Sequence, residues 1–141
     1  MTKVIYIIGA LKNWKVIDLH LELEKEGFEV FSSWLTPGPL ADEYWRKYAK
    51  KRKLTHKQGL KDWSAQHIFN FDKTHLDRCD IGILLMPAGK SGHLELGYMR
   101  GQNKPGYILF DKEPKRWDVM HNFATDVFYN KEELKQELKK L

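Results

Sequence analysis

Glu95 is the residue whose surroundings most suggest chemistry. It follows a turn that contains Gly89, Ser91 and Gly92. Small residues there allow backbone N–H groups to approach a ligand, and the start of a helix favours an anion. When a glycosidic bond breaks, positive charge develops on the sugar, and a nearby ionised carboxylate stabilises it or traps it covalently. At about 4 Å and an effective dielectric near 20, this attraction is of order 4 kcal/mol before desolvation. Glu95 is therefore our candidate nucleophile.

Such a reaction also needs a carboxyl that manages the proton of the departing base. Asp72 is the candidate, because the aromatic residues Phe69 and Phe71 beside it can hold a flat ring. Spacing alone favours simpler roles for both carboxyls. Glu95 would then be a first-turn carboxylate that interacts with a helix dipole, and Asp72 an N-cap.

Two further groups of residues are candidates for substrate binding. Gly9 and Ala10 allow a close approach of backbone to ligand, and Asn13 lies in the same turn. His93 is two residues from Glu95, so on a helix it points to a different face. It either orients a ligand through the turn or is a surface histidine.

The elements that must position these residues follow from the pattern of apolar residues. Continuous apolar runs predict strands, and helical spacing predicts helices between them. We expect strands at 4–8, 28–31, 81–86, 107–110 and 127–129. We expect helices at 14–26, 41–54, 60–76, 93–101 and 131–141, the last capped by Asn130.

This alternation predicts one α/β domain over residues 1–141, with no linker. The architecture would be a doubly wound, flavodoxin-like or Rossmann-like parallel sheet of about five strands, with helices on both faces. Ligands bind such sheets at the carboxyl ends of the strands. The turns after the first, third and fourth strands are therefore the expected site, and they contain most of the residues above.

Composition and motifs exclude several other classes. No apolar run approaches the roughly 18 residues of a membrane span, and no signal peptide is recognisable. The single cysteine, Cys79, fits a small buried residue in a reducing cytosol. The six histidines are scattered, so we expect no metal and no cofactor. Gly89-Lys90-Ser91 is not a P-loop, because position 84 is leucine rather than glycine.

The net charge of +5 comes from one segment. Residues 46–61 contain eight Lys or Arg and no acid, which leaves 16 basic against 19 acidic residues elsewhere. Such a segment can meet phosphates. A solvated helix face is the more common explanation, so the sequence alone makes a nucleic-acid partner unlikely.

The sequence also resembles a known family. The residues from Pro87 to Tyr98, those from Ile68 to Lys73 and those from Ile7 to Leu11 are similar to nucleoside 2-deoxyribosyltransferases. The resemblance implies a flavodoxin-like fold and a covalent glycosyl intermediate on Glu95. It also implies that Asp72 is the second catalytic carboxylate and that the sugar passes from one base to another. The implied partners are a nucleoside or nucleotide, a free base and further copies of the chain in a cytoplasmic oligomer.

The overall resemblance favours transfer of the sugar, but one departure from the family pattern is shared with a related branch of hydrolases, which is the close alternative. Transferases acting on free nucleosides commonly have a further Asp in the turn that reads Gly89-Lys90-Ser91 here. The branch that hydrolyses nucleoside 5′-monophosphates has a serine before the nucleophile, which helps to hold the phosphate, and Ser91 matches it. Residues 34–63 are longer and more basic than the family core, and we expect a helical insertion or a lid there. The remaining alternative is a nucleotide-binding or nucleic-acid-binding module without catalytic activity, which would engage phosphates through residues 46–61.

Overall fold

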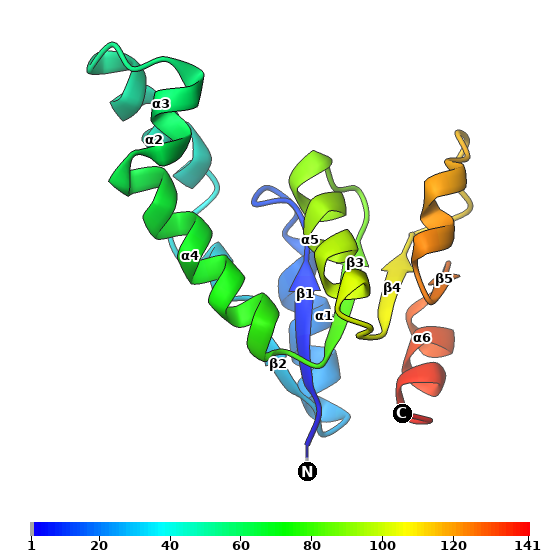
Figure 1. Ribbon diagram of the computed structural model, residues 1–141. Helices are drawn as coiled ribbons and strands as arrows, with labels where there is room; N and C mark the ends of the chain where they lie inside the picture. The colour runs from blue at the N-terminus through cyan, green and yellow to red at the C-terminus, as the bar shows by residue number, and fades with distance from the viewer. Residues whose placement is uncertain (1) are drawn as a thin grey trace.

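Five strands form one parallel sheet in the computed structural model, which describes residues 2–141 (Figure 1). The strand order is β2-β1-β3-β4-β5, and every neighbouring pair is parallel. The strands are β1 (Val4–Ile8), β2 (Glu29–Phe31), β3 (Ile81–Leu85), β4 (Gly106–Leu109) and β5 (Asp126–Phe128). The predicted α/β fold with about five parallel strands is confirmed.

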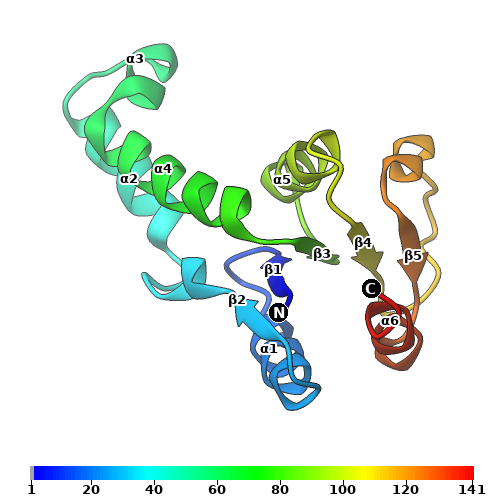
Figure 2. The same cartoon turned by 60° about the horizontal axis from the view of Figure 1, so that its bottom comes forward.

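Helices cover both faces of the sheet (Figure 2). Side chains of α1 (Lys15–Lys25) and α6 (Lys131–Leu138) pack on one face. Those of α4 (Trp63–Arg78) and α5 (Lys90–Gly101) pack on the other. Because both faces are covered, the central strands are continuously apolar rather than alternating.

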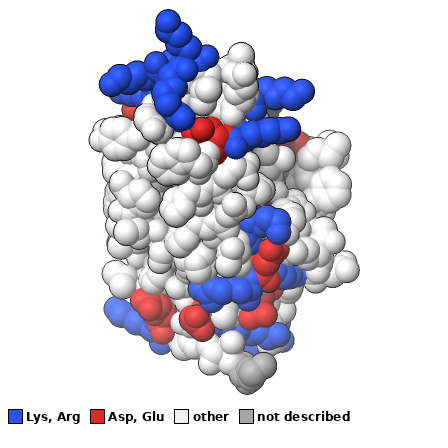
Figure 3. All heavy atoms as spheres, turned by 60° about the vertical axis from the view of Figure 1, so that its left-hand side comes forward, with Lys and Arg blue, Asp and Glu red and all other residues white. Residues whose placement is uncertain are grey.

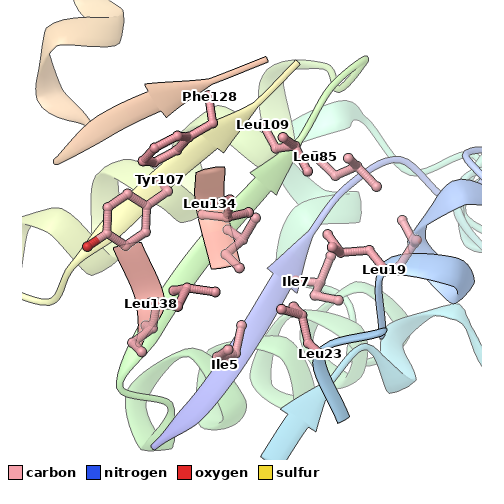
Figure 4. Close-up of a cluster of buried hydrophobic side chains, with 13 residues drawn as sticks. Ile5, Ile7, Leu19, Leu23, Leu85, Tyr107, Leu109, Phe128, Leu134 and Leu138 are labelled. Carbon is pink, nitrogen blue, oxygen red and sulfur yellow. The ribbon is translucent and has the colours of Figure 1, made fainter. Parts of the chain in front are cut away.

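The core under α1 and α6 shows how the strands supply alternate residues to the two faces. Ile5 and Ile7 of β1 point to this side and meet Leu19 and Leu23 of α1 (Figure 4). Tyr6 and Ile8 belong to the opposite core, where they pack with residues of α4 and α5. Cys79 is also buried there as a free thiol, as predicted.

The segment between β2 and β3 extends beyond the sheet. It contains the short 3-10 helix η1 (Ser33–Leu35), then α2 (Ala41–Lys51), α3 (His56–Lys61) and the start of α4. Figure 1 shows these helices projecting from one end of the sheet, and we call residues 36–63 the arm. The predicted helix over 60–76 is in fact two helices, because Asp62 has extended backbone angles (φ −69°, ψ 153°) and separates α3 from α4.

The remaining elements follow β4. A second 3-10 helix, η2 (Val119–Phe123), precedes β5, and Asn130 caps α6 through the backbone N–H of Glu133, at 2.9 Å from its Oδ1. Among residues 2–141, no helix is long and apolar enough to cross a membrane.

Candidate active site

Glu95 lies deeper in its helix than the sequence suggests. α5 begins at Lys90 rather than at His93, so Glu95 is in its second turn. The helix dipole acts mainly within the first turn, so the interpretation of Glu95 as a dipole-stabilising carboxylate is wrong. The early start was missed because Lys90, Ser91 and Gly92 looked like a turn.

Asp72 is also placed differently from the simpler expectation. It lies in the middle of α4 and half-buried, so it is not an N-cap. Its helix packs on the same face of the sheet as α5. The fold therefore brings Asp72 and Glu95 to the same side of β1, although they are 23 positions apart in the sequence (95 − 72).

The electrostatics show that the two carboxyls interact. Burial raises the pKa of Glu95 to about 8, with further contributions from the charges of Asp72 and then Asp42. Burial also raises the pKa of Asp72 to about 6, with a contribution from Asp42. Two carboxyls with raised pKa values at the expected edge of the sheet, one of them acting on the other, are typical of a catalytic site.

Asp42 was not anticipated from the sequence. It lies in the first turn of α2, near the base of the arm, and its charge acts on both carboxyls. The pattern in the sequence marked this helix only as basic and aromatic. No local signal could show that its first turn faces two other acids from α4 and α5.

Tyr6 was not predicted as a site residue, because it lies within the continuous apolar run of β1. It is fully buried, and its hydroxyl has no hydrogen-bond partner among residues 2–141. Burial raises the pKa of Tyr6, and the charges of Glu95 and Asp72 raise it further. The phenol thus belongs to the carboxyl cluster, and a buried hydroxyl without a partner calls for an explanation.

A cluster of aromatic rings from β2, α4 and β1 lies next to Asp72 in the sequence and the fold. The ring of His75 stacks on Phe31, with centroids 3.9 Å apart, and Phe71 lies edge-on to His75 at 4.8 Å. Phe31 in turn packs against Tyr6 at 5.0 Å. Phe71 remains partly exposed beside Asp72, which leaves ring surface for a flat ligand.

The turn after β1 contains the predicted residues Gly9, Ala10 and Asn13. The backbone N–H of Asn13 donates to the Ala10 carbonyl at 2.9 Å, and its Oδ1 accepts from the Lys15 N–H at 3.2 Å. The Asn13 Nδ2 is buried and has no partner among the described residues. A side chain at Gly9 would lie 3.0 Å from Val16, so packing alone accounts for this glycine.

The two glycines before Glu95 have different roles. Gly89 precedes α5 with open space around its α-carbon, and no side chain caps this helix end. The first N–H groups of a helix lack internal partners, so this end suits an anion next to the exposed Ser91. Gly92 instead lies inside α5, where a β-carbon would be 2.9 Å from Leu84 Cδ1. Its small size is required for packing.

His93 links this turn to η2. Its Nδ1 lies 2.8 Å from the Gly89 carbonyl oxygen, and its Nε2 lies 3.1 Å from Nε2 of His121. A carbonyl oxygen only accepts, so Nδ1 carries the proton. Both ring nitrogens are thus engaged within the protein, and His93 orients the turn.

A separate pocket of about 240 Å³ lies beyond the end of β4. Neither Glu95 nor Asp72 lines it. Its walls are Phe110, Glu113, Pro114, Trp117, Asp118, His121, Val127 and Tyr129. Through His121 it adjoins the His93 turn. Among residues 2–141, no group of three His, Cys, Asp or Glu side chains is arranged to hold a metal ion.

Comparison with known proteins gives a match among solved structures. No protein-family model matches the chain, and no curated protein matches it. Among solved structures, the CMP N-glycosidase BcmB of Clostridium botulinum matches with a TM-score of 0.58. The two share 18% sequence identity, and the match covers 97% of this chain and 99% of that one. This chain has the fold of that N-glycosidase. The similarity extends over nearly the whole chain, and it concerns the fold.

Proposed function

We propose that this protein cleaves the N-glycosidic bond of a nucleoside 5′-monophosphate. The pair of partly buried carboxyls formed by Glu95 and Asp72 carries the proposal, because their raised pKa values keep one proton on the pair near neutral pH, and this chemistry needs one carboxylate and one carboxylic acid. The fold shared with a CMP N-glycosidase supports it.

In the proposed reaction, a carboxylate oxygen of Glu95 attacks C1′ of the sugar. The bond from C1′ to the base nitrogen breaks, and the base leaves with a proton donated by Asp72. Water then attacks C1′, gives a proton to Asp72 and releases Glu95. The products are the free base and a sugar 5-phosphate.

The same residues account for binding of the substrate. Ser91 and the free N–H groups at the start of α5 bind the 5′-phosphate, and Lys90 adds positive charge. Phe71 stacks against the base. Gly9, Ala10 and Asn13 approach the sugar from the turn after β1, and the unpartnered Nδ2 of Asn13 is available as a donor.

Transfer of the sugar to a second base is the alternative outcome of the same intermediate. The resemblance of residues 92–101 to the deoxyribosyltransferases favours it. The absence of an Asp at residues 89–91 favours water instead. We therefore place hydrolysis first.

Product chromatography tests both reactions. Purified protein is incubated with CMP, dCMP and the corresponding nucleosides, with and without a second free base. Release of base without an acceptor, from the monophosphates in preference to the nucleosides, supports hydrolysis. A new nucleotide that forms only with the acceptor shows transfer, and no turnover in any condition contradicts both.

The covalent step has its own test. The intact mass of protein quenched during turnover is expected to show a sugar-phosphate adduct, which Glu95→Gln lacks. Ser91→Ala is expected to raise KM for the monophosphate more than it lowers kcat, because Ser91 binds the phosphate rather than the reacting bond.

We also propose that the chain forms a homo-oligomer. Trp117, Val119, Met120 and Phe123 expose large apolar side chains around η2. An exposed apolar patch of this kind commonly marks a protein interface. Light scattering coupled to size-exclusion chromatography checks this, and Met120→Glu is expected to shift the protein to monomer.

A further inference from the structure

The arm has a surface on which aromatic and basic side chains alternate. In α2, Tyr44, Lys47, Tyr48 and Lys51 are spaced i, i+3, i+4 and i+7, which places them on one face of the helix. All four are exposed. This face extends about 10 Å along the helix axis. We call these four residues the arm face.

The basic side chains of the arm are almost all free of acidic partners. Among the described residues, Arg52 is the one member of the basic run in an ion pair, with Asp62. The other seven Lys and Arg of residues 46–61 form none. Figure 3 shows a concentration of blue side chains at the upper end of the molecule, above a broad face with few charges. The sequence alone favours a solvated helix face. The structure adds that these charges remain uncompensated in the folded protein.

The aromatic rings of the arm are organised rather than scattered. Trp63, which is 66% exposed, lies edge-on to Tyr48 with centroids 6.1 Å apart. The guanidinium carbon of Arg52 lies over the same Tyr48 ring, 3.9 Å from its centroid. These contacts hold the ring of Tyr48 in place, while Tyr44 extends the same face toward the sheet.

Uncompensated lysines interleaved with ordered, exposed rings match what a single-stranded nucleic acid requires. Lysines neutralise its phosphates, and aromatic side chains stack on its unpaired bases. A duplex would engage the lysines but not the rings, because its bases are already stacked. An anionic membrane would also attract the lysines, but it would not require ordered rings at this spacing.

We propose that the arm face binds single-stranded nucleic acid. This surface is distinct from the carboxyl site, so the inference does not depend on the proposed function.

Fluorescence anisotropy with a labelled dT12 oligonucleotide tests the proposal. Wild-type protein is titrated between 50 and 300 mM NaCl, and binding is expected to weaken as salt rises. Lys47→Gln/Lys51→Gln is expected to reduce the slope of log K against log salt by about 1.4, at about 0.7 per phosphate contact. The matched control is Lys115→Gln/Arg116→Gln, which removes two exposed charges outside the arm.

A second pair of variants isolates stacking. Tyr44→Leu is expected to weaken dT12 binding between about fivefold and about a hundredfold, with the salt slope unchanged. Trp117→Leu removes a ring that is at least as exposed (76%, against 60% for Tyr44) but lies outside the arm, and it is expected to bind as wild type does.

Four results would overturn the proposal. They are the absence of dT12 binding, equal loss in the arm and control variants, equal affinity for a twelve-base-pair duplex, and binding to phosphatidylserine vesicles without binding to dT12. Activity on CMP is measured in parallel. If activity is absent while dT12 binding follows the predictions, the proposed function fails and this inference stands.

Discussion

The indole N–H of Trp34 donates a hydrogen bond to the Ile7 carbonyl oxygen at 2.7 Å. This contact joins the start of the long β2–β3 connection to the end of β1, next to Gly9. An ion pair between Lys12 and Glu43, at 3.2 Å, joins the same turn to the first turn of α2. The arm is therefore fixed at its base, and Asp42 is held near Asp72 and Glu95.

The first prediction concerns Asp42→Asn. The negative charge of Asp42 raises the pKa of both Glu95 and Asp72, so its removal lowers both values. The pH profile of kcat/KM is expected to shift to lower pH on both limbs. Asp18→Asn, which removes an exposed aspartate from the first turn of α1, serves as the control. A profile that is unchanged in Asp42→Asn would show that this carboxylate does not act on the pair.

The pH dependence of the wild type follows from the carboxyl pair itself. The pKa of Asp72 is about 6 and that of Glu95 about 8, so between these limits the pair holds one proton, which in the free protein resides mainly on Glu95. The proposed reaction uses the other one-proton form, with the proton on Asp72. The ratio of the two forms does not depend on pH, so it lowers the rate without moving the pH profile. Below about pH 6 both groups are neutral and no nucleophile remains. Above about pH 8 both are ionised and no proton is available for the base. We expect a bell-shaped kcat/KM profile centred near pH 7, and activity that rises steadily to pH 10 would contradict the assignment.

Tyr6→Phe tests whether the buried phenol serves the reaction. Removal of an unpartnered buried hydroxyl is expected to stabilise the free protein by about 1 kcal/mol or more. If the hydroxyl donates to ionised Glu95 in the complex, kcat/KM falls roughly 10- to 100-fold. Thermal unfolding checks the expected gain in stability, and kinetics on the same sample check the expected loss in kcat/KM. A variant that is less stable and fully active would contradict this role.

Glu95→Gln tests the cost of burying this carboxyl. Its folded pKa of about 8 lies above its ordinary value of 4.5, so the folded protein binds the proton more tightly. The contribution of Glu95 to stability is therefore full below about pH 4.5 and is lost as pH rises through 8. Because Gln cannot ionise, we expect the variant to exceed wild type by about 2 to 4 kcal/mol at pH 8 and by little at pH 5. Denaturant titrations at the two pH values measure this, with Glu113→Gln as the exposed control.

Two glycines of α5 give a matched test of packing. In Gly92→Ala the new methyl lies 2.9 Å from Leu84 Cδ1, so the variant is expected to lose about 1 to 3 kcal/mol of stability. Gly97→Ala meets nothing within 4 Å and is expected to gain up to about 1 kcal/mol from helix propensity. Melting temperatures measure this: Gly97→Ala is expected to melt above wild type and Gly92→Ala below it, if α5 packs on β3 through Gly92.

The sequence allowed prediction of the strands better than of the site. The run from Ile81 to Leu85 is apolar throughout, because α5 and the α1–α6 face cover both of its sides. Tyr6 and Asp42 could not be found in this way. Their proximity to Glu95 arises from packing between β1, α2 and α5, which leaves no local pattern in the chain.

Boundaries were harder to predict where residues of low helix propensity begin a helix. Ser91 and Gly92 are poor helix formers, yet both lie in α5, where Gly92 is buried and Leu84 and Ile8 leave no room for a larger residue. The break at Asp62 was also missed, because an acid that precedes a helix resembles one within it.

The continuity of α4 has a mechanical consequence. It is one uninterrupted helix from Trp63, at the arm, to Arg78, which leads into β3, and it is about 24 Å long. Asp72 is part of this helix. Between Asp72 and the arm, the first interruption of the helical backbone is at Asp62. A displacement of Trp63 along the helix axis is therefore expected to displace Asp72 as well, because the helix between them is continuous.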